Sequence, residues 1–341
     1  MEKLKQKKKK KVSESYQIPS DLLLDIFSRV PGKSVGRFRC LSKFWRSKLG
    51  LRYFTKLFRT NSLACPRLLF SIRVDENLLF FSSPQPQNPV DNSSLVATRY
   101  RMKFRKNLPY RVSPPLSGSV FLHRRGRKER VICNPITGES ITLPKKKDYY
   151  GRGANTHWVL TLGTRKLKWR KTVKCKQHEA RYGGIGINGV LYYRAYYVQS
   201  SMIVCFDFSS EKFRFVKLHE EMSDGTLINY KGNLGLLVKH EREVVLWVLE
   251  KDGGKHKWSQ SISVSINDEI GIHFIIVGMT GAGEIVFVPY HREDPFYLVY
   301  YNIERNTFAR VNGHIQGSEE FKNRKILVTT FLDYAENMKL L

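Results

Sequence analysis

Residues 18–49 read IPSDLLLDIFSRVPGKSVGRFRCLSKFWRSKL, and this stretch decides how the chain begins to fold. Ser20 or Asp21 can accept a backbone hydrogen bond and so cap a helix. Apolar residues then recur at helical spacing until Pro31 and Gly32 end the helix. The same spacing predicts two further short helices, over 34–41 and 42–49. The apolar positions of the three helices are Leu22, Leu23, Ile26, Phe27, Val30, Val35, Phe38, Leu41, Phe44, Trp45 and Leu49.

Three helices in about 32 residues bury too little apolar surface to be stable alone. They must pack on a neighbouring domain, and their surplus of apolar residues favours a partner protein. Residues 16–60 contain ten Lys or Arg and two acids, Asp21 and Asp25, so an acidic partner surface is favoured. The alternative is an ordinary helical cap whose apolar faces are all internal.

The stretch resembles an F-box from residue 16 to about 55, with a proline-led first helix, SRVP after it and KSVGRFRCLSKFW behind. The resemblance implies binding to the Skp-family adaptor of Skp–cullin–F-box ubiquitin ligases, and through it to cullin and RING subunits. Gly36 stands where the family commonly has a helix former, and glycine inside a helix costs about 1 kcal/mol relative to alanine. The second helix is therefore expected to be weak. The expected adaptor contacts are Pro19, Leu22, Leu23, Ile26, Phe27, Val30, Pro31, Phe38 and Trp45.

A chain of 341 residues can hold one small and one larger domain. Its five cysteines are scattered, odd in number and without a CxxC pair, which indicates reduced thiols rather than disulfides or a zinc site. Apolar runs stay short of the ~18 residues of a membrane span, and no secretory signal is recognisable. We therefore expect an intracellular protein, in the nucleus or the cytoplasm, with no membrane partner.

The formal net charge of +29 favours acidic partners and brings a risk of non-specific nucleic-acid binding. Part of the excess lies in KLKQKKKKK, from Lys3 to Lys11, within a tail (1–15) that is predicted to be disordered. This run is interpreted as a nuclear import signal or a basic arm, or equally as a solvated charge run that nothing recognises.

After a connector over 61–67, short apolar runs rich in β-branched and aromatic residues predict an all-β domain over 68–341. A weak repeat places Asn134, Asp207 and Asn302 six residues before a second strand, alternating with Trp169 and Trp258. The 95 residues from Asp207 to Asn302 fit two propeller blades of about 40–50 residues each. Only 73 residues separate Asn134 from Asp207, so about 20 are missing from this period, between Lys147 and His157.

The β segment resembles the F-box-associated interaction domain, type 3, of plant F-box proteins. The motifs that carry this resemblance are NPITGESITLP, VLTLGTRKLKWR, GGIGINGVLYYRA, FDFSSEKFRFVKL, LWVLEKDGGKHKWS and LDYAENMKLL. The family usually has a further aromatic strand after the NPxTG hairpin, where this chain has KKKDYYGRGANTHW. The expected fold class is α+β and multi-domain: a three-helix F-box over 16–60, followed by a mostly β, propeller-like domain with an incomplete blade.

No pattern of residues favours catalysis. The GxGxxG match over 184–189 is followed by a strand rather than a helix, so Asn188 and Gly189 predict a hairpin turn and not a dinucleotide site. The nine histidines are dispersed, with no HExxH, GxSxG or Walker pattern. The basic, aromatic segments 103–111 and 165–176 could bind nucleic acid, but strand alternation explains the second more simply. We expect no enzyme activity, cofactor or metal.

The resemblance implies the substrate receptor of a cullin–RING ubiquitin ligase, with the target protein held by loops of the β domain whose residues the sequence does not identify. Two alternatives remain at this point. The first is a basic nucleic-acid-binding protein, a less favoured reading that rests on the charge excess. The second is a decayed, non-functional family member, suggested by the short stretch after Lys147.

Overall fold

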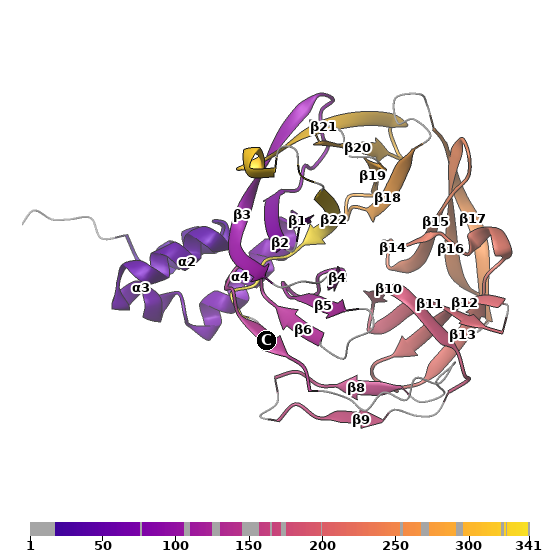
Figure 1. The fold of residues 1–341 in the computed structure, drawn as a ribbon, viewed down its shortest axis with the longest axis horizontal. Helices are drawn as coiled ribbons and strands as arrows, with labels where there is room; N and C mark the ends of the chain where they lie inside the picture. Colours follow the sequence, from indigo (N-terminus) through magenta and orange to yellow (C-terminus); the bar gives the residue numbers. More distant parts are fainter. Residues whose placement is uncertain are drawn as a thin grey trace, which may run out of the picture.

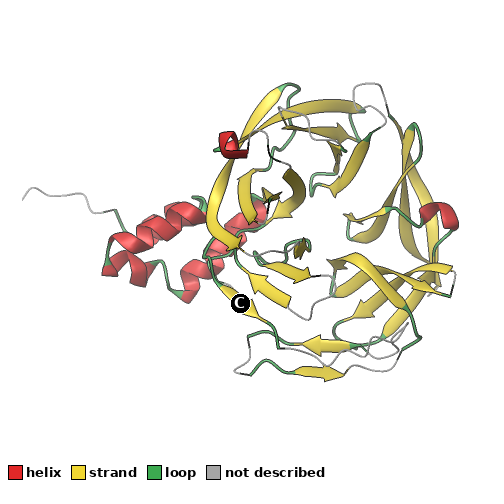
Figure 2. Cartoon of the chain, viewed as in Figure 1, coloured by secondary structure: helices red, strands yellow, loops and turns green. Residues whose placement is uncertain are grey.

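Helices at the start of the chain adjoin a ring of small β-sheets (Figures 1 and 2). The computed structural model describes residues 18–75, 77–105, 110–124, 130–144, 157–163, 166–171, 175–198, 200–252, 255–266, 273–290, 296–321, 324 and 326–339. The basic tail and most of segment 103–111 lie outside the residues that are described or whose side chains are described.

Four helices, rather than the three expected, precede the sheets. They are α1 (Ser20–Ser28), α2 (Gly32–Leu41), α3 (Lys43–Lys48) and α4 (Arg52–Ala64). The expected side-chain cap of α1 is wrong: Pro19 occupies the N-cap position and no side chain caps the helix. The hydroxyl of Ser42 does cap α3, by accepting a hydrogen bond from the Trp45 N–H at 3.2 Å.

Helix α4 takes up most of the predicted connector, because Phe54 and Phe58 give it a buried face one turn apart. The fully buried Phe54 and Phe58 rings pack with α1 and α2 residues and also with Met338, near the other end of the chain. The next strand begins at Arg67, so the described chain passes from helix to sheet within two residues.

Gly36 lies in the interior of α2, and a Cβ added there would meet no atom within 4 Å. We expect Gly36→Ala to stabilise the protein by about 1 kcal/mol, because alanine has the higher helix propensity and nothing must move. Urea unfolding would measure this gain. Gly50→Ala is the matched control and should bring no gain in stability, because its added Cβ would lie only 2.9 Å from the Arg46 carbonyl oxygen. Equal effects of the two substitutions would contradict the prediction.

The ring closes where the last strand of the chain pairs with the first. Antiparallel pairing joins β22 to β1, with Ile72 opposite Val328, and parallel pairing of β21 with β3 joins a second unit to make an eight-stranded sheet. The first unit comprises β22 (Ile326–Tyr334), β1 (Arg67–Val74), β2 (Asn77–Pro84) and β3 (Ser93–Arg105). The second comprises β18 (Phe274–Met279), β19 (Glu284–Pro289), β20 (Phe296–Asn302) and β21 (Thr307–Ile315).

Three further four-stranded sheets complete most of the ring. They are β4 (Tyr110–Val112), β5 (Val120–Arg124), β6 (Arg130–Cys133) and β7 (Ser140–Thr142); β10 (Glu179–Ile187), β11 (Val190–Tyr197), β12 (Ser200–Asp207) and β13 (Phe213–Lys217); and β14 (Thr226–Tyr230), β15 (Asn233–Lys239), β16 (Glu243–Asp252) and β17 (Lys255–Ser265). Short 3-10 helices lie at η1 (Glu220–Met222) and η2 (Ser318–Phe321). The propeller-like architecture is as predicted.

Among the residues that the structure describes, the short repeat corresponds to a sheet of two strands, β8 (Trp158–Leu160) and β9 (Trp169–Lys171). The sequence between Lys147 and His157 lies outside the described residues. The indole N–H of Trp169 donates to the Pro144 carbonyl oxygen at 2.9 Å, and its ring packs against Leu143. Trp169 thus joins this small sheet to the preceding unit.

The repeated Asn or Asp residues begin the turns that join the last two strands of three units. The side-chain oxygens accept backbone N–H groups inside each turn, from Ile136 to Asn134 at 2.9 Å, from Ser209 to Asp207 at 3.0 Å and from Arg305 to Asn302 at 3.0 Å. The hairpin predicted at Asn188 and Gly189 is confirmed, since both residues have positive φ (49° and 78°) between β10 and β11.

Candidate partner-binding surfaces

Helix α1 is apolar on two sides. Leu24 and Phe27 face the helical core and are buried, whereas Leu22 and Ile26 are 53% and 52% exposed. Leu22 and Ile26 lie one helical turn apart and therefore share a face, and the exposed Ile18 lies just before the helix. An apolar face left in water on a helix whose other side is already packed is typical of a protein-binding surface.

The nine residues predicted to contact the adaptor fall into three groups. Pro19, Leu22, Ile26 and Pro31 are exposed, and Leu23, Val30, Phe38 and Trp45 are half-buried. Phe27 is buried, and its ring meets Phe38 and Trp45 edge-to-face at centroid distances of 4.7 and 4.9 Å. Phe27 therefore holds α1 against α2 and α3. Contact of the nine residues with an adaptor stays a prediction.

Two further apolar side chains are exposed beside these helices. Leu41 ends α2 with 69% of its side chain exposed, and Phe44 on α3 is 54% exposed. The sequence placed both on helix faces without counting them as adaptor contacts. Phe38 and Trp45 fill the inward-facing positions of α2 and α3, which leaves Leu41 and Phe44 to face outward.

The carboxylate of Glu336 fixes the helices to the β domain. It is 3% exposed and accepts the Gly32 N–H at the start of α2 at 2.7 Å and the Tyr100 hydroxyl on β3. The Arg67 guanidinium lies 3.6 Å away, and the Glu336 N–H donates to the Ser62 hydroxyl on α4 at 2.6 Å. Burial, followed by the negative charge of Glu336, raises the pKa of Tyr100 well above its usual range. One residue thus contacts both parts of the chain.

A cavity of about 1250 Å³ opens inside the ring of sheets. Strands β1, β4, β10 and β22 contribute to its wall, and its side chains include Arg73, Arg111, Arg181 and His123 together with the Phe121 ring. No Asp or Glu stands among the described residues that line it. The cavity can therefore accept an anionic group next to aromatic surface.

Positive charges in the cavity act on one another. Burial and then the charge of Arg111 lower the pKa of Arg73, and burial, Arg111 and Arg130 lower the pKa of His123. A lowered pKa keeps His123 neutral at pH 7, while the arginines stay charged. An anion bound here would relieve the repulsion between the guanidinium groups.

The two buried cysteines, Cys133 and Cys205, are poor nucleophiles. All five are free in the described part of the chain, and burial raises the pKa of Cys133 to about 12 and that of Cys205 to about 11. A buried, protonated thiol is unreactive. Cys40 and Cys65 are exposed, and Cys175 is half-buried.

The helical region and the β domain each match a known protein family. The F-box domain family matches residues 16–57, and the F-box associated beta propeller domain family matches residues 67–152 and 149–335. The chain belongs to the F-box proteins with this propeller domain. The exposed face of α1 is therefore part of an F-box, and the ring of sheets is the associated propeller.

Similar F-box proteins occur in Arabidopsis thaliana. The chain is 40% identical to F-box protein DOR, with 95% of this chain and 94% of that protein covered. It is 43% identical to putative F-box protein At1g53370, with 95% and 93% covered. Among solved structures, TolB from Acinetobacter baumannii matches 79% of this F-box protein and 59% of its own chain, at 10% identity and a TM-score of 0.36. None of the described helices is long and apolar enough to cross a membrane.

Proposed function

We propose that this F-box protein is the substrate receptor of a Skp–cullin–F-box ubiquitin ligase. The exposed apolar face of α1, which lies inside the matched F-box, carries the proposal. In it, the helices bind a Skp-family adaptor and the propeller domain binds a target protein. The excess of Lys and Arg in residues 16–60 favours binding to an adaptor whose surface is acidic.

The junction at Glu336 supports a mechanism that works by proximity. A receptor that holds its target at a fixed place raises the effective concentration of target lysines near the conjugating enzyme. A rigid connection between adaptor-binding helices and target-binding domain serves this purpose better than a flexible linker. This function needs no catalytic residue in the chain and places the protein inside the cell.

We expect Ile26→Asp to weaken binding of the full chain to purified adaptor at least about tenfold, because a carboxylate would have to be buried in an apolar contact. Affinity would be measured at about 150 mM salt, where the Debye length is near 8 Å. Val90→Asp is the matched control, since Val90 is 73% exposed but lies outside the helices. Failure of the wild-type chain to bind, or equal affinity of the two variants, would overturn the proposal.

The net charge of +29 supports the alternative of nucleic-acid binding. This alternative predicts binding to duplex or single-stranded nucleic acid, with the logarithm of the affinity falling steeply and linearly with log[salt]. It also predicts that Ile26→Asp does not weaken this binding. Adaptor binding depends on apolar burial and should change far less over the same salt range.

A further inference from the structure

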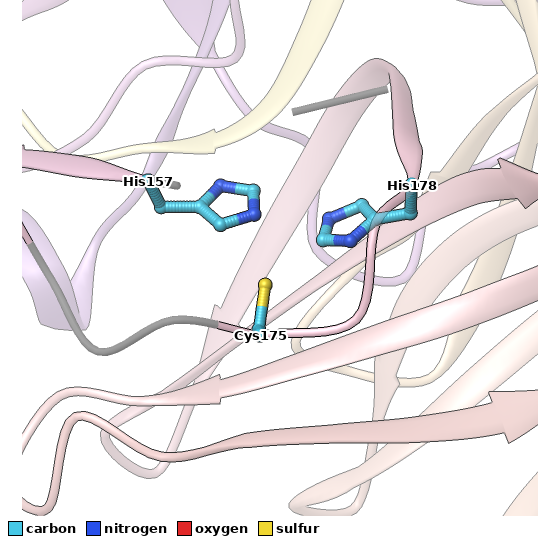
Figure 3. A group of neighbouring side chains, drawn as sticks. All are labelled: His157, Cys175 and His178. Carbon is cyan, nitrogen blue, oxygen red and sulfur yellow. The ribbon is translucent and has the colours of Figure 1, made fainter. Parts of the chain in front are cut away.

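Two histidines and a cysteine from two separate segments meet beside the central cavity (Figure 3). His157 directly precedes β8, while Cys175 and His178 lie in the segment that leads into β10. One ligand atom from each residue lies within 4.8 Å of the other two. Figure 3 shows the Cys175 sulfur directed into the space between the two imidazole rings.

Hydrogen bonds hold His178 in one tautomer. Its Nδ1–H donates to the Lys176 carbonyl oxygen at 2.8 Å, and its Nε2 lies 2.8 Å from the Tyr193 hydroxyl, from which it accepts. A backbone carbonyl on one ring nitrogen is the usual support of a metal-ligating histidine, because it leaves the lone pair on the other nitrogen. A metal ion bonded to Nε2 would take the place of the Tyr193 hydroxyl, so the Tyr193 side chain must turn away when the ion binds.

The donor set determines which ions fit. A thiolate with two imidazoles suits zinc and similar transition metals, and it does not suit Mg²⁺ or Ca²⁺, which require oxygen ligands. In a tetrahedral zinc site, with bonds of about 2.0–2.3 Å, the ligand atoms lie about 3.3–3.6 Å apart. The ligand atoms, now within 4.8 Å of one another, must therefore approach by up to about 1.2–1.5 Å, and the two imidazole rings, which now stack with their centroids 4.7 Å apart, must turn toward the ion by side-chain rotation.

We propose that His157, Cys175 and His178 bind one Zn²⁺ ion, with water in the fourth position. His157 and Tyr193 both line the cavity, so the open position faces it. The ion ties β8 to β10 and so connects the two-stranded sheet to the complete unit that follows. A two-stranded sheet is marginally stable alone, which gives such a connection a structural purpose.

The test is a Co²⁺ titration of the full chain, prepared without a histidine tag and freed of metal by a chelator. We expect one equivalent of Co²⁺ to give a thiolate-to-cobalt charge-transfer band that Zn²⁺ abolishes by displacement. Cys175→Ser should remove the band, and His178→Asn or His157→Asn should lower Co²⁺ affinity at least about tenfold. Cys65→Ser and His219→Asn, both at exposed positions, are the matched controls and should leave band and affinity unchanged.

A second readout does not depend on the variants folding. Zn²⁺ should slow alkylation of Cys175 in the wild-type chain, measured by mass spectrometry, without slowing that of Cys40 or Cys65. Absence of a charge-transfer band at one equivalent, its persistence in Cys175→Ser, or alkylation of Cys175 at a rate unaffected by Zn²⁺ would each overturn the proposal.

Discussion

Glu336→Ala should lower the free energy of unfolding by about 3–5 kcal/mol, the range for removing one partner of a buried ion pair. The substitution leaves the Arg67 guanidinium, whose side chain is 13% exposed, without its carboxylate. It also removes the acceptor of the Gly32 N–H and of the Tyr100 hydroxyl, two groups held in buried hydrogen bonds. Urea unfolding of the full chain would measure the loss.

Two matched variants separate the causes of this loss. Glu320→Ala removes a carboxylate that is 65% exposed and pairs with Arg99, so it should cost no more than about 1 kcal/mol. Glu336→Gln keeps the shape and one acceptor oxygen, so its cost should lie between the costs of the two alanine variants. Equal losses in Glu336→Ala and Glu320→Ala would show that the buried contacts at Glu336 do not stabilise the protein.

Glu336→Ala should also affect how the helices are held against the propeller. The Glu336 carboxylate lies at the N-terminus of α2, where a negative charge interacts favourably with the helix dipole and so stabilises the helix. Hydrogen exchange of α2 amides should therefore rise more than exchange in β15 and β16. These two strands belong to another sheet than β3, which carries Tyr100, and β22, which precedes Glu336. Uniform changes across the chain would indicate global destabilisation only.

Local patterns in the sequence predicted the parts of the fold that depend on neighbours along the chain. The helical spacing around Ile26, the turn at Asn188 and the Asn or Asp turns of the repeat are each set within about ten residues. The short interval between Asn134 and Asp207 predicted an incomplete unit, and the two-stranded sheet of β8 and β9 lies in this interval. These features correspond to periodicity and turn chemistry, which the sequence displays directly.

Contacts between distant residues could not be predicted in this way. Gly32 and Glu336 are 304 positions apart, and nothing near either residue indicates the other. Pairing of β22 with β1 and the cationic wall of the cavity depend equally on closure of the ring. The spacing of Cys175 and His178 is visible in the sequence, but His157 joins them only because β8 lies beside the start of β10.

Gly118→Ala should cost about 2–5 kcal/mol, because it combines backbone strain with a collision. Gly118 has a φ of +81°, a conformation that costs an L-residue about 1–2 kcal/mol. A Cβ at this position would lie 2.5 Å from the Asn337 Cβ and 2.8 Å from the Asn337 backbone nitrogen. Displacing packed backbone adds about 1–3 kcal/mol.

The collision falls on the segment that holds Glu336 in place. The Tyr334 hydroxyl donates to the Gly118 carbonyl oxygen at 3.3 Å, and the Asn337 side-chain amide donates to the Ser117 carbonyl oxygen at 3.1 Å. Moving Asn337 away from residue 118 must therefore disturb Glu336, its neighbour in the chain. We expect the losses caused by Gly118→Ala and Glu336→Ala to be less than additive in the double variant, since both disrupt the same contacts.

Gly138→Ala isolates the contribution of backbone strain. Gly138 has a similar φ of +76°, but a Cβ there would meet no atom within 4 Å, so only the ~1–2 kcal/mol of strain should appear. The difference between the two alanine variants then measures the cost of displacing the C-terminal segment. If Gly118→Ala costs no more than Gly138→Ala, the segment moves aside freely, and the helices must be held to the propeller by their apolar contacts with Ile136 and Met338 instead.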